Sequence, residues 1–384
     1  MENTFKDFEF FVLAPNDWNG QRMNRQQLFS RVAQYSPVVY SKGLKHSWEL
    51  GKKSLLLANP ISRFEEYEDV LVDQPSSLLV RIKKWKLYDR IVLRIHAYHL
   101  ARKKDNKKKS VLYIFHPQFV DYVRTFEYDI LVYHPFDDFS KQGEVSISFI
   151  ADESYLVQNA DLVITPSLGV TNNLKDKYQR SDIKTVHNGV DYHAFAQYAK
   201  QNQDLPPQNN KHKRVGYVGS INQKVDIDLL IFLACNFPEV SFEFVGPVGS
   251  MGNKASAFEE LSKMANVKLH GSKPYQELPK ITAEFDCLLM CYDTSDKLWA
   301  GLAYPLKLNE YLAVKVPVIS CDLPSVPFLN TLVDVASTHD SWAQCLTEIF
   351  AGNYSKQNFG FEYASDQDWD ARVAEIATLL HGIK

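Results

Sequence analysis

Short apolar runs rich in β-branched residues alternate with longer stretches of helical periodicity along almost the whole chain of 384 residues. This alternation favours parallel β-sheets covered by helices, because every parallel crossover needs a connection long enough to hold a helix. We expect a first set of strands at Phe10–Ala14, Val38–Tyr40, Ser54–Ala58, Val111–Phe115, Ile130–Tyr133, Leu162–Thr165 and Lys184–Val186. We expect a second set at Val215–Val218, Ser241–Val245, Val267–Leu269, Cys287–Met290 and Val316–Ser320.

A polar segment separates the two sets of strands. It runs from Tyr192 to Arg214, is rich in Gln, Asn and Lys, and contains the pair Pro206-Pro207. Few of its residues could fill a core, so we expect an interdomain linker. The predicted parts are therefore a first domain at 1–191, a linker at 192–212 and a second domain at 213–353.

The last part of the chain has the pattern of one more helix. Ser365 or Asp366 is a candidate N-cap, and apolar residues follow at helical spacing. We expect a C-terminal helix within 365–384 that returns to the first domain.

Composition narrows the class of protein. A net charge of −3 with 45% hydrophobic and 23% charged residues is typical of a soluble globular protein, and it argues against a nucleic-acid partner. No run approaches the roughly 18 apolar residues that a membrane-spanning helix requires. The first residues, 1–7, lack the basic and then apolar pattern of a secretion signal. We therefore expect a cytoplasmic protein.

Positive charge is concentrated in the segment from Arg81 to Lys109. It holds twelve basic residues against two acids, a net charge of +10, while the rest of the chain carries −13. On a helical wheel one stripe is basic and the opposite face is apolar; the basic stripe is Lys83, Lys86, Arg90 and Arg94, and the apolar face is Trp85, Tyr88, Val92 and Ile95. Such a face can hold anionic lipid headgroups, so we expect peripheral binding to a membrane. The alternatives are a solvated helix that runs into a disordered loop at Arg102–Lys109, and a site for nucleic acid.

A second motif, Pro305-Leu-Lys-Leu-Asn-Glu-Tyr-Leu-Ala313, precedes a buried strand. Proline suits the first position of a helix, so this helix presents free backbone amides to an anion. Lys307 in the first turn opposes the helix dipole unless an anion such as a diphosphate is bound there. Glu310, one turn on, can accept hydrogen bonds from the two hydroxyls of a ribose. The alternative is an ordinary amphipathic helix.

This helix and three further motifs resemble the nucleotide-sugar glycosyltransferases of the GT-B fold. The further motifs are His187-Asn-Gly-Val-Asp191, Tyr217-Val-Gly-Ser220 and Ala160-Asp-Leu-Val-Ile-Thr-Pro-Ser167. The chain is most similar to bacterial polysaccharide enzymes around family 4 and to the xanthan-type glucuronosyltransferases. The resemblance implies an α/β fold of two Rossmann-like domains that face a cleft, with the donor held mainly by the second domain and the acceptor by the first.

The resemblance also implies roles for residues of the second domain. Glu310 holds the ribose, and Lys307 holds the diphosphate with the helix amides that begin at Leu306. The remaining donor-side candidates are Gly219 and Ser220 near the phosphates, Gly271 and Ser272 near the base, and Tyr292, for which packing is an equal alternative. Many retaining family 4 enzymes carry a second Glu eight residues before the ribose Glu, and this chain has Leu302 there. That difference favours inversion over retention.

In the first domain, Asp137 follows a predicted strand and so falls at the carboxyl end of the sheet, where open α/β folds bind ligands. It resembles the catalytic base of the xanthan-type enzyme, with Asp138 as the neighbour that orients it. The alternative is that this pair caps a helix or binds solvent. Arg22, Arg25 and His116 also follow strands and are candidates for contact with acceptor phosphate or sugar, or else are structural. The resemblance implies that neither a metal nor another cofactor takes part.

The expected function is transfer of a sugar from a nucleoside diphosphate donor, UDP-linked, to a saccharide or lipid-linked acceptor in bacterial surface polysaccharide synthesis. We expect inversion with Asp137 as base, at the inner face of the cell membrane. The alternatives are a UDP-sugar 2-epimerase of the same fold, which needs no lipid acceptor, and a non-catalytic sugar-binding or scaffold protein.

Overall fold

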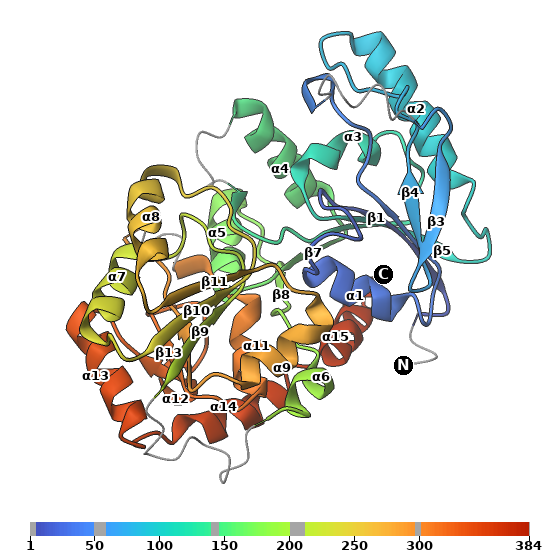
Figure 1. Ribbon diagram of the computed structural model, residues 1–384. Helices are drawn as coiled ribbons and strands as arrows, with labels where there is room; N and C mark the ends of the chain where they lie inside the picture. The colour runs from blue at the N-terminus through green and yellow to red at the C-terminus, as the bar shows by residue number, and fades with distance from the viewer. Residues whose placement is uncertain (1–4, 50–58, 140–145, 200–211, 296–300, 384) are drawn as a thin grey trace. The chain divides into compact units, whose positions relative to one another are not determined.

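The computed structural model describes residues 5–49, 59–139, 146–199, 212–295 and 301–383. The chain divides into two compact units, each built on its own sheet (Figure 1). Unit 1 comprises Met1–Val186 together with Asp370–Lys384, and unit 2 comprises His187–Trp369. The predicted α/β class is confirmed, since helices connect successive parallel strands in both units.

Unit 1 contains a sheet of eight strands in the order β3-β4-β2-β1-β5-β6-β7-β8. The strands are β1 (Phe8–Leu13), β2 (Val38–Ser41), β3 (Arg63–Tyr67), β4 (Val70–Gln74), β5 (Lys109–Ile114), β6 (Ile130–Tyr133), β7 (Leu162–Thr165) and β8 (Lys184–Thr185). The helices are α1 (Asn24–Val32), α2 (Lys86–Ala101), α3 (Val120–Val123), α4 (Ile147–Asn159), α5 (Leu168–Tyr178) and α15 (Trp369–His381). β3 pairs antiparallel with β4, and the other neighbours pair parallel.

The central strands follow the sequence pattern closely, for a physical reason. β1, β6 and β7 are buried along their whole length, as expected of parallel strands covered on both faces. β6 and β7 have the predicted bounds, and β1 begins two residues before the predicted start. The strand predicted at Ser54–Ala58 lies outside the described residues.

The hairpin of β3 and β4 was not predicted. β3 has the sequence Arg-Phe-Glu-Glu-Tyr and is only partly buried, so it lacks the apolar run on which the prediction relied. Glu68 and Asp69 form the connecting turn with φ values of 49° and 63°, a left-handed pair that suits a two-residue hairpin. An edge strand that faces solvent tolerates such charges.

Unit 2 contains a parallel sheet of six strands in the order β11-β10-β9-β12-β13-β14. The strands are β9 (Arg214–Val218), β10 (Ser241–Val245), β11 (Val267–Gly271), β12 (Cys287–Met290), β13 (Val318–Ser320) and β14 (Asp334–Val335). The helices are α6 (Tyr192–Ala196), α7 (Ile227–Asn236), α8 (Ala255–Lys263), α9 (Leu278–Ala283), α11 (Leu306–Ala313), α12 (Leu329–Leu332), α13 (His339–Phe350) and α14 (Lys356–Ser365). Figure 1 shows helices on both sides of this sheet, with α7 and α8 on one side and α9 and α11 on the other.

The predicted domain limits differ from the observed units. Unit 2 begins at His187 and includes α6, whose Phe195 is fully buried, so the linker predicted at 192–212 begins inside a packed element. Unit 2 also continues beyond residue 353 to Trp369, because α14 packs against α11 and α12. These contacts join segments far apart in sequence and leave no local signature.

The C-terminal helix begins later than predicted. Ser365 is the last residue of α14, and α15 starts only at Trp369. The expected apolar positions Val373, Ile376 and Leu380 are buried. From Asp370 onward the helix belongs to unit 1.

Candidate functional site

In unit 2, the glycines that follow β9 and β10 bring two chain turns into direct contact. The strands pair from Ser241 with Arg214 to Val245 with Val218, so Gly219 and Gly246 lie side by side at the carboxyl edge. Their φ values of +142° and +149° disfavour other residues. A Cβ on Gly246 would lie 2.0 Å from the carbonyl oxygen of Gly219. The amides of Gly219 and Gly246 donate to the carbonyls of Val245 and Gly271, so the two glycines fix the close contact between these turns.

Lys307 reaches this glycine turn from α11. It is the second residue of the helix and only 9% exposed. Its Nζ lies 3.5 Å from the ring centroid of Tyr217 and 5.2 Å from that of Tyr292. A Cβ on Gly219 would lie 2.8 Å from the same Nζ. The ammonium group is therefore held between two aromatic rings and the start of the loop after β9.

Lys307 and Glu310 have strongly shifted pKa values. Burial lowers the pKa of Lys307 to about 7, although nearby Cys291 and Glu310 oppose the change. Burial likewise raises the pKa of the half-buried Glu310 carboxyl to about 7, and Lys307 opposes that change. Neither charge is fully stabilised by its surroundings, so a ligand that supplies an anion to Lys307 and hydroxyl donors to Glu310 would stabilise both.

The segment before α11 is fixed by the motif at 187–191. The Asn188 side chain donates to the carbonyl of Tyr304 at 2.8 Å, and Asn309 donates to the carbonyl of Asn188 at 2.8 Å. The His187 ring stacks on Tyr304 at 4.4 Å between centroids. Pro305 is the N-cap and not, as predicted, the first helical residue. No side chain of the described residues caps this end, so first-turn amides other than that of Leu308, which donates to the carbonyl of Pro305, can serve an anion.

The other donor-side candidates lie at the same edge. Gly271 ends β11 and accepts a hydrogen bond from the amide of Gly246, and Ser272 is exposed beside it. The carbonyl of Ser220 accepts from the Tyr217 hydroxyl at 3.0 Å. Tyr292 follows β12 and is largely buried. The structure thus brings the donor-side residues together, and their contact with a donor stays a prediction.

Unit 1 has a different group of residues at the carboxyl edge of its sheet. Arg25 is the second residue of α1 and 1% exposed. Its guanidinium carbon lies 4.4 Å from the ring centroid of Phe136 and 6.0 Å from that of Phe115, which follow β6 and β5. Its Nε and Nη1 have no hydrogen-bond partner within the described parts of the chain. Arg25 was predicted as an acceptor-side residue.

Two histidines follow β5 and β6 near this arginine. His134, which was not predicted, is bound through Nδ1 to the Tyr113 hydroxyl at 2.7 Å, and its buried Nε2 has no partner among the described residues. His116 accepts a hydrogen bond from the amide of Gln118. Burial lowers the pKa of His134 to about 3 and that of His116 to about 4, and Arg25 adds to both shifts. Both rings are neutral at physiological pH.

His134 had a signal in the sequence that could have revealed it. Both histidines stand directly before a proline and directly after a predicted buried strand, as His116-Pro117 and His134-Pro135. Of the two, only His116 is among the predicted site residues. Gly246, which also was not predicted, occupies the corresponding position after β10.

The two predicted aspartates occupy different environments. Asp137 is half-buried, and its Oδ1 accepts a hydrogen bond from the amide of Asp138 at 2.9 Å. Asp138 is 2% exposed and accepts from the side chain of Asn173 on α5. Asp138 therefore fixes the turn on which Asp137 is carried. Arg22 pairs with Glu68 at 2.9 Å and donates to Ser30 at 3.0 Å.

The basic segment differs from its helical-wheel prediction. Arg81 is buried and paired with Asp89 and Asp121, so its charge is not presented to solvent. Lys83 precedes α2 and does not belong to its stripe. The buried face of the helix also carries two polar residues, Asp89 and His96. The Nε2 of His96 lies 2.8 Å from a carboxylate oxygen of Asp73 on β4.

The apolar face of α2 is rotated relative to the prediction because these polar contacts fix the helix on the sheet. Val92 is buried as predicted, but Trp85 and Ile95 are exposed at 64% and 48%. The turn from Arg102 to Lys108 is ordered by hydrogen bonds, among them one from the amide of Asp105 to Glu9. The alternative of a disordered loop there is therefore wrong.

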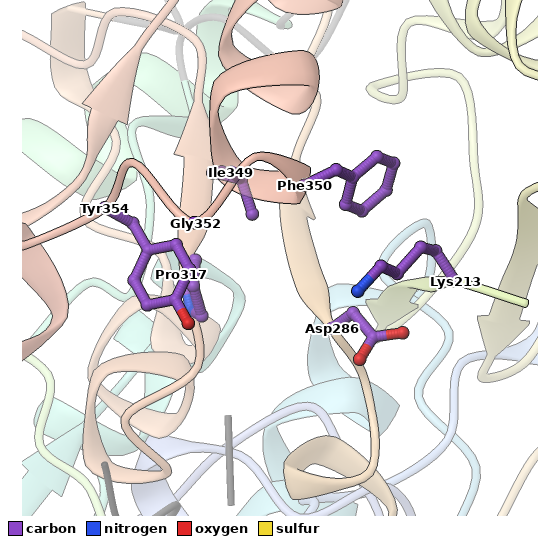
Figure 2. A pocket seen from close by; sticks show the side chains of 7 residues that line it. All are labelled: Lys213, Asp286, Pro317, Ile349, Phe350, Gly352 and Tyr354. Carbon is purple, nitrogen blue, oxygen red and sulfur yellow. The ribbon is translucent and has the colours of Figure 1, made fainter. Parts of the chain in front are cut away.

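A pocket of about 180 Å³ lies at the opposite edge of the unit 2 sheet (Figure 2). Its walls include Lys213, Asp286 and Pro317, which directly precede β9, β12 and β13. Ligands of open α/β sheets bind at the carboxyl ends of the strands, so this pocket is separate from the candidate donor site.

Within the described residues, no group of three or more His, Cys, Asp or Glu side chains could hold a metal ion. Metal independence stays a prediction. Helices in these parts of the chain are all too short or too polar to cross a membrane.

The fold has close counterparts among solved structures. Sucrose-phosphate synthase from Thermosynechococcus elongatus superposes with a TM-score of 0.70 at 13% identity, covering 98% of each chain. HepE of Anabaena, solved in complex with UDP and glucose, superposes with a TM-score of 0.68 at 15% identity, covering 98% of this chain and 99% of its own. The chain has the GT-B fold. The predicted resemblance to GT-B glycosyltransferases is confirmed.

No protein-family model matches the chain. Among curated proteins it is similar to the teichuronic acid biosynthesis glycosyltransferase TuaH of Bacillus subtilis, whose assignment is itself provisional. The two are 27% identical over an alignment of 236 residues, and the match covers 58% of this chain and 57% of TuaH. The match therefore spans little more than half of that relative.

Proposed function

We propose that the protein is a glycosyltransferase that moves a sugar from a UDP-linked donor to a saccharide or lipid-linked acceptor in polysaccharide synthesis. The observation that carries the proposal is the pair Lys307 and Glu310 on α11, beside the glycine turn at Gly219 and Gly246. An ammonium group and free helix amides suit a diphosphate, and a carboxyl group one turn on suits a ribose.

Similar proteins support this reading. TuaH is described as a glycosyltransferase, and HepE was solved with UDP and glucose. The same fold also holds non-transferase chemistry, so the site must carry the argument. In this chain the shifted pKa values of Lys307 and Glu310 mark two groups that a nucleoside diphosphate would stabilise together.

For the chemical step we propose inversion at the anomeric carbon. The carboxylate of Asp137 takes the proton from an acceptor hydroxyl, and the hydroxyl oxygen attacks the anomeric carbon as the bond to the diphosphate breaks. The electron pair of that bond leaves with the nucleoside diphosphate. Lys307 and the amides of α11 stabilise the negative charge that develops there, which supplies the role that a metal ion has in other transferases.

A donor panel tests the proposal. UDP-sugars are incubated with the full chain and a bacterial membrane extract, and release of UDP is measured with and without EDTA. We expect release that depends on the extract and is unaffected by EDTA. Asp137→Asn should reduce it by about 10² to 10⁴ with UDP binding unchanged, as for loss of a general base. Glu310→Ala should weaken UDP binding itself.

Three outcomes would contradict the proposal. Conversion of the donor to an epimer without acceptor would show an epimerase. UDP-sugar binding without turnover by any extract would show a binding protein. Unchanged turnover in both variants would remove Asp137 and Glu310 from the mechanism.

We further propose that α2 docks the protein on the inner face of an anionic membrane. Basic side chains at Lys86, Arg90 and Arg94 are exposed, and each contributes roughly 1 kcal/mol near such a surface. The same face exposes Leu87 at 73% and Tyr98 at 72%. Basic and apolar side chains on one helix face are typical of helices that lie in the membrane interface.

Vesicle sedimentation tests this docking. The triple variant Lys86→Gln, Arg90→Gln, Arg94→Gln should bind vesicles containing phosphatidylglycerol about 100-fold more weakly, from loss of about 3 kcal/mol. A control variant neutralises Lys263, Lys273 and Lys280, which are exposed in unit 2, and should bind as the unaltered protein does. Equal loss in both variants, or binding to neutral phosphatidylcholine vesicles alone, would show that α2 is not a specific anionic docking surface.

A further inference from the structure

Arg25 is a buried cation for which the described residues of unit 1 supply no counter-charge. The guanidinium is 1% exposed, and both Nε and Nη1 lack a hydrogen-bond partner within the described residues. Its neighbours are the aromatic rings of Phe136 and Phe115 and the hydroxyl of Tyr40. Across the described segments, no carboxylate pairs with it. Arginine stays protonated in proteins, so the charge is present and uncompensated.

A buried, unpaired charge is costly, and proteins retain one mainly where a ligand completes the pairing. The effective cost of desolvating an ion is several kcal/mol even after relaxation. Burial lowers the pKa of Arg25, which reports the same unfavourable environment. The rings of Phe136 and Phe115 offset only part of this cost through cation–π contact.

Two further polar groups near this edge also have no partner. Asn24, the first residue of α1, is 4% exposed, and its Oδ1 has no hydrogen bond among the described residues. The Nε2 of His134, which directly follows β6, is also buried without a hydrogen-bond partner among the described residues. The Met23 and Asn24 end of α1 is also a helix N-terminus, which favours negative charge. Three side chains of unit 1, two on α1 and one after β6, therefore present unsatisfied polar atoms at the carboxyl edge of one sheet.

We propose that Arg25 binds an anionic group, a carboxylate or phosphate, on the saccharide acceptor. The inference rests on the proposed function, since it specifies the acceptor of that reaction. A carboxylate or phosphate accepts two parallel hydrogen bonds from an arginine, either from Nε and Nη2 or from Nη1 and Nη2. Nε and Nη1 of Arg25 each lack a partner among the described residues, so either pair of donors can receive the anion. The half-buried ring of Phe136 covers the guanidinium, so the ligand reaches it by turning that ring aside. Asp137 directly follows Phe136, which places the anion site one residue from the proposed base.

Binding to simple sugars tests this without knowledge of the natural acceptor. The full chain is titrated calorimetrically, in the absence of nucleotide, with methyl glucuronoside, glucose 6-phosphate, methyl glucoside and inorganic phosphate. We expect one or both charged sugars to bind at least about tenfold more tightly than methyl glucoside. The tighter of the two identifies carboxylate or phosphate as the recognised group, and either result supports the proposal.

Variants assign the preference to Arg25. Arg25→Gln should weaken binding of the preferred charged sugar by about 30-fold or more, as for removal of one partner of a buried charge pair. Arg25→Lys keeps the charge but not the planar fork, so it should retain a smaller preference and serves if the glutamine variant does not fold. Arg31→Gln removes a charge from the same helix, where Arg31 pairs with Asp370, and should keep the full preference.

UDP titration separates this inference from the proposed function. Every variant should bind UDP as the unaltered protein does, because the donor residues lie in unit 2. Equal binding of methyl glucoside and both charged sugars would overturn the inference, as would a preference that survives in Arg25→Gln and Arg25→Lys. Inorganic phosphate that binds as tightly as the charged sugars would show a free-anion site. Failure to bind UDP would instead contradict the proposed function.

Discussion

Lys307 in unit 2 and Arg25 in unit 1 occupy equivalent positions in their helices. Each is the second residue of a helix that follows a strand end, each is almost fully buried, and each lies over an aromatic ring. They differ in what surrounds the charge. Lys307 has Glu310 one turn away and a glycine turn at its tip, whereas Arg25 has aromatic rings and no carboxylate among the described residues.

This difference shows how the two edges are built. The unit 2 edge carries its cation and acid on a single short helix, beside two turns that Gly219 and Gly246 allow into direct contact. The unit 1 edge is assembled from α1, β5 and β6, which are distant in sequence. A contiguous site has a recognisable motif, and a dispersed site does not.

The largest expected effect concerns the glycine turn, which has no counterpart around Arg25. In Gly246→Ala the new Cβ would lie 2.0 Å from the backbone oxygen of Gly219, so the backbone must move. We expect the free energy of unfolding to fall by about 3 kcal/mol or more, together with loss of UDP binding. Urea unfolding and UDP titration measure both.

Gly271→Ala is the matched control for this substitution. Gly271 has a φ of +67° but no heavy atom within 4 Å of an added Cβ, so only backbone strain is expected, about 1 kcal/mol. Equal destabilisation by the two substitutions would show that contact between the β9 and β10 turns does not matter.

The second-largest expected effect is weaker UDP binding after loss of the Lys307 charge. Lys307→Met keeps an apolar stem against Tyr217 and removes the charge. We expect about 100-fold weaker UDP binding with little change in stability, since a charge-assisted hydrogen bond to the diphosphate is lost. Lys280→Met, at an exposed position on α9, should have no effect. A change of less than about threefold for Lys307→Met would remove Lys307 from the diphosphate site.

The smallest effect is a pH dependence that only the unit 2 edge should show. With both pKa values at about 7, Glu310 becomes protonated as the pH falls below 7, and Lys307 loses its charge as the pH rises above 7. UDP affinity should therefore be greatest near pH 7 and should fall by up to about tenfold per pH unit on either side.

Variants assign the two limbs of this profile. Glu310→Gln should remove the loss at low pH, and Lys307→Met should remove the loss at high pH. The phosphate of UDP titrates in the same way with every variant, so differences between their profiles isolate the protein groups. A profile that keeps both limbs in both variants would contradict the assignment.

Much of unit 2's site could be predicted because its determinants are local. The Pro-x-Lys-x-x-Glu spacing places Lys307 and Glu310 three residues apart, on neighbouring positions of one helix. Gly246 could not be predicted from its own sequence, because only the register of β9 and β10 places it against Gly219. For α2, the sequence showed an amphipathic basic helix but gave its apolar face the wrong orientation, because Asp73 and His96 fix that face through a long-range contact.

By itself the sequence determined the α/β class, most strand positions and the helix that carries Lys307 and Glu310, since hydrophobic periodicity and short motifs act over a few residues. Only the tertiary structure decided that unit 2 begins at His187, that Arg81 is neutralised by Asp89 and Asp121, and that Arg25 has no counter-charge from the part of the chain that the structure describes. Each of these depends on which distant segments come into contact. Burial and pairing are properties of those contacts, and no local pattern records them.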